Sequence, residues 1–112
     1  MVLTVTGKNK VRDLMDTNKD YGELGTSATA EKESDTGLLA AVAATQVSLT
    51  SSTAGKQVTF TYELNSVTGN GNTYQEFQNT ISTGTNLNRT TFAGVAKTGA
   101  IEVQVITTFT FV

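Results

Sequence analysis

The sequence predicts an all-β protein, an antiparallel β-sandwich of about six to eight strands with one short N-terminal helix. Three observations lead to this fold class. Apolar and polar residues alternate along 46–50, 56–64 and 101–112, as in strands with one buried face. Clusters of Gly, Asn and Ser separate the patterned segments, as turns do. Threonine, which is β-branched and suits a half-exposed sheet, makes up about a fifth of the 112 residues.

The N-terminal part of the chain contains the predicted arm and helix. Residues 1–6 (MVLTVT) alternate weakly and are expected to form a strand or an extended arm, ahead of a single sandwich domain spanning 7–112. In 8–15, apolar residues at spacings of three and four form one helical stripe, enough for about two turns that cover the end of a sheet. Residues 16–22 (DTNKDYG) have turn chemistry throughout. Residues 27–37 show no periodicity and are expected to form an exposed loop.

The clearest hairpin lies in the middle of the chain. In 56–64 an apolar side chain stands at every second position, from Val58 to Leu64. The five-residue turn 51–55 joins this strand to the strand at 46–50, which predicts an antiparallel hairpin. Just before it, the apolar run LLAAVAA is interpreted as the start of a buried strand, with a short helical turn as the alternative.

The C-terminal half is expected to supply three more strands. A strand at 73–77 contains a bulge, because Tyr74 falls out of phase with the apolar residue that ends it. A loop is predicted at 79–86, followed by a less regular strand at 87–95. The tight turn 97–100 then joins that strand to the final one as a second hairpin.

The final stretch, 101–112 (IEVQVITTFTFV), is the longest strand predicted. At about 3.3 Å per residue it spans roughly 40 Å. One face is apolar and ends in Phe109 and Phe111, which are expected to be core anchors. The other face is polar except for Ile106 and Val112, and we expect these two residues to contact another subunit.

Composition excludes several classes of function. The chain has no His, Cys, Trp or Pro. Without Cys and His, the usual zinc and copper sites and the Ser-His and Cys-His nucleophile pairs are excluded, and we expect no catalytic residue, metal or cofactor. The net charge is −2 with single, scattered Lys and Arg, so no nucleic acid is expected as a partner. No apolar run approaches the ~20 residues of a membrane helix, and the N-terminus lacks the features of a secretory signal.

The strongest candidate for a cation site is the polar segment after the predicted helix. Asp16, Asn18 and Asp20 place oxygen atoms at alternate positions, which suits calcium. An EF-hand loop needs Gly at its sixth position and Glu at its twelfth, where this chain has Tyr21 and Ser27. A polar turn without a metal is therefore the favoured interpretation.

An acidic cluster in the long loop is the candidate for acid–base chemistry. It consists of Glu31, Glu33 and Asp35, and two carboxylates can serve as a general acid and base. Such a pair needs a pocket. A polar loop with Lys32 between the first two carboxylates favours solvated side chains instead.

Two features point toward carbohydrate. Asn88-Arg89-Thr90 fits the N-glycosylation acceptor pattern. Tyr21, Tyr62 and Tyr74 are candidates for a surface on which sugars stack, although the phase of Tyr62 with its apolar neighbours favours a core position.

Four segments, in this order, resemble a family of small virion structural proteins of tailed phages and tailed archaeal viruses, often described as tail or tail-fibre proteins. The segments are Thr6-Gly7-Lys8 leading into the predicted helix, Leu24-Gly25-Thr26 with Asp35-Thr36-Gly37-Leu38, the run 71–77 (GNTYQEF), and the run 87–92 (LNRTTF) with the final strand. Their order covers nearly the whole chain. The sequence departs from the family at Gln78 and Asn79, where such proteins tend to have Gly-Leu-Phe.

The resemblance implies a β-sandwich used as a repeated, non-enzymatic part of a virion, on the capsid, neck, tail or fibre. Its partners would be further copies of the chain and other virion proteins. Residues 1–6 are expected to add a strand to a neighbouring subunit. The expected interface residues are apolar and lie near the two ends of the chain: Val2, Leu3, Val5, Ile106 and Val112. Charged residues expected to orient subunits are Lys8, Lys10, Arg12 and Arg89, facing Glu31 and Glu33.

The alternative function is a receptor- or carbohydrate-binding module at a virion tip, with a host receptor as its partner. This module would need a groove formed jointly by the loops 27–37, 66–72 and 79–86.

Overall fold

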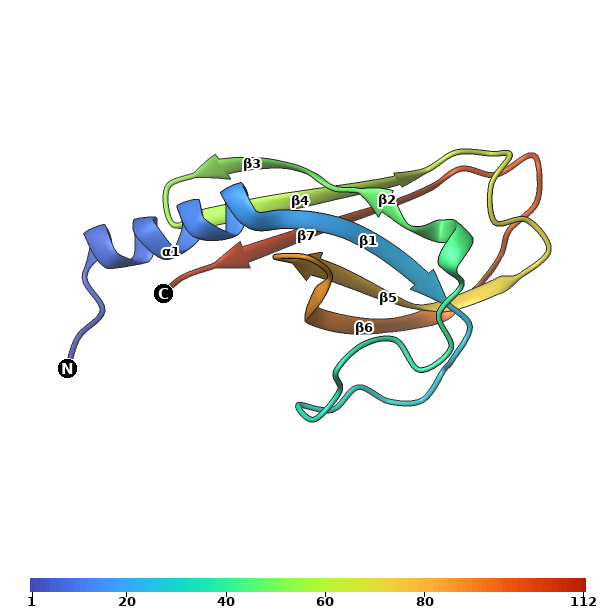
Figure 1. Cartoon of the computed structure of the whole chain (residues 1–112), viewed down its shortest axis with the longest axis horizontal. Helices are drawn as coiled ribbons and strands as arrows, with labels where there is room; N and C mark the ends of the chain where they lie inside the picture. The colour runs from blue at the N-terminus through green and yellow to red at the C-terminus, as the bar shows by residue number, and fades with distance from the viewer.

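The computed structural model describes all 112 residues and confirms the predicted fold class, a small antiparallel β-sandwich with one N-terminal helix (Figure 1). The elements are α1 (Val5–Asn18), β1 (Lys19–Gly25), η1 (Ala43–Thr45), β2 (Val47–Ser48), β3 (Thr50–Ala54), β4 (Gln57–Leu64), β5 (Thr73–Ile81), β6 (Thr85–Ala96) and β7 (Val103–Thr110). One sheet has the strand order β2-β1-β5-β6 and the other β3-β4-β7. Every strand pairing is antiparallel.

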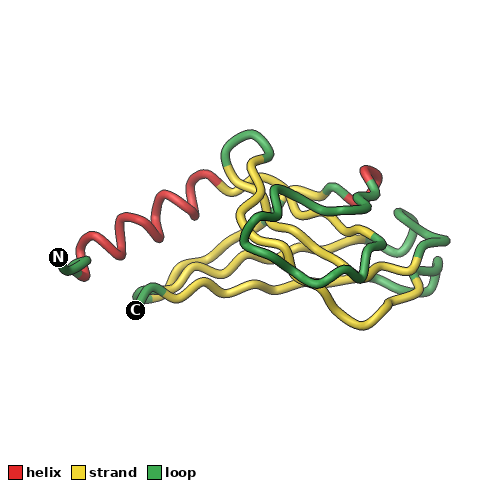
Figure 2. Tube along the Cα trace, turned by 90° about the horizontal axis from the view of Figure 1, so that it is seen from below, coloured by secondary structure: helices red, strands yellow, loops and turns green.

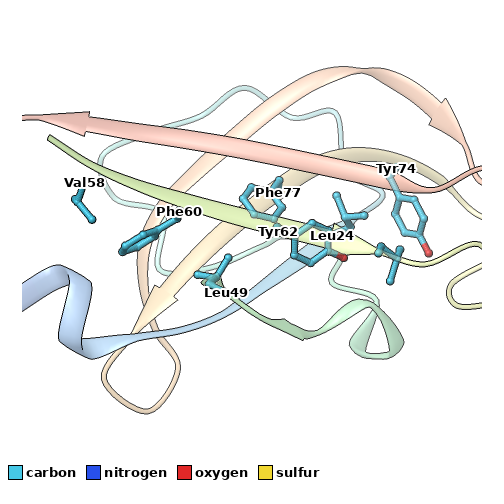
Figure 3. Packing of buried hydrophobic residues seen from close by; sticks show 8 residues of the cluster. Leu24, Leu49, Val58, Phe60, Tyr62, Tyr74 and Phe77 are labelled. Atoms are coloured by element: carbon cyan, nitrogen blue, oxygen red, sulfur yellow. The ribbon is translucent and has the colours of Figure 1, made fainter. Parts of the chain in front are cut away.

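The core lies between the two sheets and is centred on β4 (Figure 3). The predicted apolar face of β4, with Val58, Phe60, Tyr62 and Leu64, is fully buried. The facing sheet contributes Phe77, whose ring lies 5.0 Å from that of Tyr62 in an edge-to-face arrangement. The period-two pattern of β4 therefore identified the central strand of the core.

The pairing of β5 with β6 is irregular where a bulge in β5 was predicted, but the extra residues lie in β6. The register of the two strands shifts between Tyr74 and Glu76. Between these two pairs, residues 92–94 of β6 stand opposite Gln75 alone, so β6 is the bulged strand. Tyr74 and Phe77 are both buried, although they stand three positions apart and strict alternation would place them on opposite faces of β5.

The predicted hairpin around β4 exists, but its turn is shorter than expected. Residues 51–54, assigned to the turn, form most of β3 and pair with β4 without a break. The chain reverses at Gly55 and Lys56, and Gly55 has φ +56°, which glycine adopts without a Cβ clash. These residues were predicted as a turn because their side chains are polar. They are polar because β3 lies at the edge of its sheet.

Two further predictions in the C-terminal half are wrong. The expected loop 79–86 is mostly strand, because β5 continues to Ile81 and β6 begins at Thr85, with positive φ at all three residues of the turn between them. The expected second hairpin is absent, since β6 pairs with β5 whereas β7 pairs with β4 in the other sheet. Hydrogen bonds between Lys97 and the 71–72 backbone hold the chain where it crosses between the sheets.

The region around residues 38–46 also differs from the favoured interpretation. It forms no buried strand beyond an isolated bridge between Ala41 and Gly25. The alternative, a short helical turn, is present as η1.

The helix α1 is longer than predicted at both ends. It begins at Val5, with the hydroxyl of Thr4 accepting a hydrogen bond from the Gly7 N–H at 3.1 Å as an N-cap. It continues to Asn18, and β1 follows at once, so the turn predicted at 16–22 is wrong. Residues 5 and 6, expected in the arm, belong to the helix. Figure 2 shows α1 extending away from the sandwich, at the same end as the C-terminus.

Candidate functional site

The N-terminal residues expected at a subunit interface are all uncovered. Val2 is 84% exposed, and Leu3 and Val5 are each more than half exposed. Residues 1–4 form no regular structure before α1. The chain itself therefore provides no partner for these apolar side chains.

Helix α1 is attached to the sandwich by one side only. The Arg12 guanidinium donates to the carbonyl of Gly55, and the Asp16 carboxylate accepts from the Ser51 hydroxyl. Met15 is the one apolar residue of the predicted helical stripe that packs against the core. These contacts hold the helix against the β3–β4 hairpin.

The opposite side of α1 carries an exposed apolar stripe. Leu3, Val11 and Leu14 are exposed, and the Leu3 side chain lies over Gly7, 3.1 Å from where a Cβ would stand. Gly7, Val11 and Leu14 are spaced by four and three residues, which places them along one face of α1, and Leu3 precedes the helix and lies against Gly7 on that face. We call these four residues the α1 stripe. The apolar stripe predicted in 8–15 is therefore divided, because Val11 and Leu14 belong to the exposed α1 stripe and only Met15 packs against the core. The α1 stripe does not cover the end of a sheet.

The two C-terminal interface residues are also exposed. Ile106 is 60% exposed on the outer face of β7, and Val112 is 96% exposed at the chain end. The other side chains of β7 alternate as predicted between half-buried and exposed. Phe109 packs edge-to-face on Phe60 with ring centroids 5.6 Å apart, and Phe111 packs against the same core.

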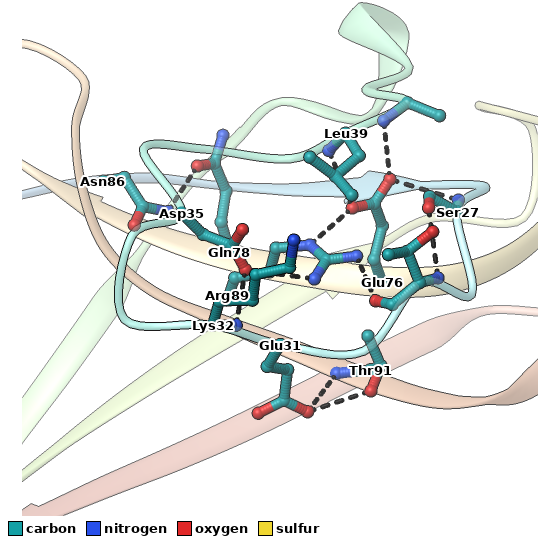
Figure 4. Close-up of polar contacts among 12 residues, drawn as sticks. Ser27, Glu31, Lys32, Asp35, Leu39, Glu76, Gln78, Asn86, Arg89 and Thr91 are labelled. Carbon is teal, nitrogen blue, oxygen red and sulfur yellow. Dashed lines mark hydrogen bonds and ion pairs between the residues drawn. The ribbon is translucent and has the colours of Figure 1, made fainter.

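A buried ionic cluster fixes the long loop between β1 and η1 to the sheet (Figure 4). The Arg89 Nε donates to Glu76 at 2.9 Å, and Arg89 Nη1 donates to Asp35 at 3.2 Å. The Glu76 carboxylate also accepts from the backbone N–H groups of Ser27, at 3.1 Å, and of Leu39 and Ala40, at 2.9 and 2.8 Å. We call this arrangement the Glu76 clamp.

The position of Arg89 in the Glu76 clamp shows that its expected role in orienting subunits is wrong. Its residue exposure is only 7%, so it cannot orient a neighbouring subunit through its charge. Burial alone would raise the pKa of Glu76, but the hydrogen bonds from Arg89 and the loop backbone outweigh it and hold the pKa below its ordinary value. The ionised carboxylate is therefore the form that the fold stabilises.

The acidic cluster of the loop does not form an acid–base pair. Glu31 accepts hydrogen bonds from the Thr91 N–H and hydroxyl, both at 2.9 Å, and these lower its pKa. Asp35 accepts from the Lys32 N–H and from Arg89, which lower its pKa too. A general acid needs a raised pKa, and the pKa values of these two carboxyl groups are lowered. The third member of the cluster, Glu33, is exposed. The carboxylates at 31 and 35 serve as ionised acceptors that hold the loop.

The segment considered as a candidate cation site forms regular structure instead of a turn. Asp16 and Asn18 lie in the last turns of α1, and Asp20 lies in β1. The Asn18 side chain donates to the carbonyl of Leu14 at 2.7 Å, and Asp16 is engaged by Ser51. The protein has no group of three or more acidic side chains arranged to hold a metal ion.

The features that pointed to carbohydrate are dispersed. Tyr62 and Tyr74 are fully buried, and their hydroxyls donate to the carbonyls of Thr45 and Gly69, so neither belongs to a stacking surface. Asn88 is half-buried within β6, and its side-chain oxygen accepts from Asn79 at 3.0 Å. These contacts leave no exposed aromatic platform.

The three loops proposed for a binding groove lie apart. The 66–72 segment and the 82–84 turn stand at opposite ends of β5, which is nine residues long. The 27–37 loop crosses β5 and β6, where the Glu76 clamp holds it (Figure 4). The groove required by the receptor-binding alternative is therefore not formed by this chain alone.

One open depression of about 390 Å³ lies at the end of β4 and β7. Its lining residues are Glu63, Leu64, Asn65, Glu102, Val103 and Gln104. The Glu63 carboxylate accepts from the Gln104 side chain at 2.9 Å, and both glutamates are exposed. Exposed carboxylates in an open depression remain solvated, so the depression has no chemistry of its own.

Comparisons of the chain with protein-family models, with curated protein sequences and with solved structures found no match. None of the helices has both the length and the apolar character needed to span a bilayer. The class that the structure defines is a small β-sandwich whose exposed large apolar side chains gather mainly near its two chain ends.

Proposed function

We propose that this protein is a structural subunit that assembles with further copies of itself, as a repeated part of the virion of a tailed virus. The observation that carries the proposal is α1, a helix of 14 residues with no buried residue. Helices of about this length are marginal in water on their own and gain stability from a packed apolar face. The α1 stripe is such a face without a partner in the chain.

The place of assembly is supported by the resemblance of four sequence segments to tailed-virus structural proteins. Capsid, neck, tail and fibre are all consistent with a repeated β-sandwich. The receptor-binding alternative has less support, because the loops it needs lie apart and two of its three tyrosines are buried. The proposed protein is not an enzyme, and its partners are its own copies and other virion proteins.

The α1 stripe is tested by placing charges in it. The double variant Val11→Asp/Leu14→Asp should remove association through α1 and so lower the molar mass of the assemblies, measured by light scattering over a range of concentrations. The matched control, Thr6→Asp/Thr17→Asp, adds the same two charges at exposed polar positions of α1 and should assemble normally. A wild-type protein that stays monomeric at all concentrations would contradict the proposal.

The virion setting needs a separate test. Purified particles labelled at the C-terminus of this chain should show the label at one repeated location by electron microscopy. If particles carry no label while the purified protein still assembles, the virion is the wrong setting and self-assembly stands.

A further inference from the structure

The four edges of the two sheets differ in how they are protected. An unprotected edge strand is a template for pairing with another chain. The edges are β2 and β6 in one sheet and β3 and β7 in the other. Strand β2 has only two residues, and β3 lies against α1, through Asp16 and Ser51. Strand β6 has two register shifts against β5, and Glu31 from the loop accepts from the Thr91 N–H.

Strand β7 has none of these protections. Its eight residues, VQVITTFT, include no charged residue, glycine or proline. Its register with β4 runs through eight consecutive pairs without a bulge. Charges, prolines, bulges and covering segments are the devices by which proteins block an edge. The edge of β7 lacks them all, and no strand pairs with it on its outer side.

The backbone groups that β7 leaves free can be assigned from its ladder. The Phe111 N–H donates to the Lys56 carbonyl at 3.0 Å, so odd-numbered residues bond toward β4. Bonding directions alternate along an antiparallel strand. The even-numbered residues Gln104, Ile106 and Thr108 therefore direct their N–H and carbonyl groups outward.

We infer that the edge of β7 pairs antiparallel with β7 of a second copy of this chain, about a two-fold axis at Ile106, to form a continuous six-stranded sheet. In this register Ile106 faces its own symmetry mate, and Gln104 faces Thr108. Each of these pairs consists of residues with outward backbone groups, so each exchanges two hydrogen bonds.

The strand is complementary to itself in this register. On the inner face Val103 lies opposite Phe109, and Val105 lies opposite Thr107. On the outer face the charged residue next to the strand, Glu102, lies opposite Thr110, so no like charges meet. Ile106, the one large apolar side chain exposed on the outer face, is covered by its mate. A symmetric dimer requires this kind of self-complementary patch.

The extended N-terminal residues of another copy are the competing occupant. They number four, because α1 begins at Val5, whereas the β7 edge is eight residues long. A second β7 matches the edge in length, and the arm does not. The second copy of β7 is therefore the favoured occupant.

Cross-linking tests the contact directly, because the chain has no cysteine of its own. Opposed residues in a hydrogen-bonded antiparallel pair have Cα atoms about 5.5 Å apart, within the span of a disulfide. Ile106→Cys should form a covalent dimer under diamide at least about tenfold faster than Ser52→Cys, since paired thiols react at a raised effective concentration. Ser52 is exposed on β3, the other edge of the same sheet, and serves as the control.

A backbone test uses proline. In Thr108→Pro the lost N–H points outward, so the ladder to β4 stays intact, as edge prolines allow. This variant should lose the β7–β7 contact and sediment as a smaller assembly than wild type, while Thr108→Val keeps the N–H and should sediment like wild type. If Thr108→Pro fails to fold, Ile106→Lys is used instead. This substitution places two ammonium groups against each other at the two-fold axis, so it should also remove the β7–β7 contact.

Either of two results overturns the inference. One is Ile106→Cys cross-linking no faster than Ser52→Cys. The other is preferential cross-linking of Ile106→Cys to Val2→Cys in a mixture, which would assign the edge to the arm.

The inference rests on the proposed assembling role, but the two fail separately. Helix α1 lies on the β3 side of the sheet, so the Val11→Asp/Leu14→Asp variant should leave the Ile106→Cys cross-link in place. Assembly through α1 without that cross-link would refute only the β7 contact.

Discussion

Replacing Glu76 by Gln should remove much of the stability of the fold. In the protein, one carboxylate oxygen accepts from Leu39 and Arg89, and the other accepts from Ser27 and Ala40. Glutamine has the same shape but keeps only one acceptor oxygen, and its NH₂ group would face two of these donors. Each buried donor left without an acceptor costs about 1–3 kcal/mol.

The charge adds to this cost, because Arg89 would keep only Asp35 as an anionic partner. Breaking a buried ion pair from one side typically costs about 3–5 kcal/mol. We therefore expect Glu76→Gln to lower the free energy of unfolding by about 3–5 kcal/mol, a large share of the roughly 5–15 kcal/mol typical of a small domain.

Urea denaturation of both proteins measures this difference, with the slope of the transition checked for change. The matched control is Glu63→Gln, because Glu63 is exposed and accepts only from the Gln104 side chain. The control should stay within about 0.5 kcal/mol of wild type. A loss below about 1 kcal/mol in Glu76→Gln would refute the clamp as a main source of stability.

Three further outcomes follow from the core and the clamp. Gly22→Ala should lower the free energy of unfolding by about 1–3 kcal/mol, because its Cβ would stand 2.5 Å from Tyr62; thermal denaturation measures it. Tyr62→Phe should cost about 1 kcal/mol in urea denaturation, since the 2.7 Å hydrogen bond to the Thr45 carbonyl is lost. The lowered pKa of Glu76 means that its contribution is complete above its ordinary value of 4.5 and is lost as the pH falls through the lower folded value. Acid titration of unfolding should show this loss in wild type, and the Glu76→Gln variant should show less of it.

The sequence predicted the strands with one buried face and missed what their backbones pair with. Alternation identified β4 and β7, because burial of one face imposes a period of two. It did not reveal that β7 pairs with β4 instead of β6, since the pattern specifies a face and not a neighbour. Strand β3 was mistaken for a turn because its Ser and Thr side chains lie on an exposed edge.

The buried charges were missed for a different reason. Charged residues are rarely buried unless they are paired, so Arg89 was expected at the surface, and Glu76 was given no role. A signal was present: opposite charges lie in two successive predicted strand regions of an otherwise weakly charged chain. Of the apolar residues predicted to form a stripe in 8–15, Val11 and Leu14 are exposed and only Met15 packs inward, because periodicity does not tell whether a helix face meets its own domain or another.

The exposed apolar residues are distributed in a way that separates folding from assembly. Ten large apolar side chains are exposed. Except for Leu39 and Val67, all of them lie in the N-terminal segment and α1, in β7, or at the C-terminal residue. The segments between α1 and β7 instead supply the fully buried core residues and the Glu76 clamp. Since α1 lies beside β3 and β7 is the opposite edge, the two proposed contacts lie on opposite sides of one sheet. A two-fold contact alone closes into a dimer, whereas a second, different contact allows assembly to continue. Blocking β7 should therefore leave smaller assemblies that α1 still joins.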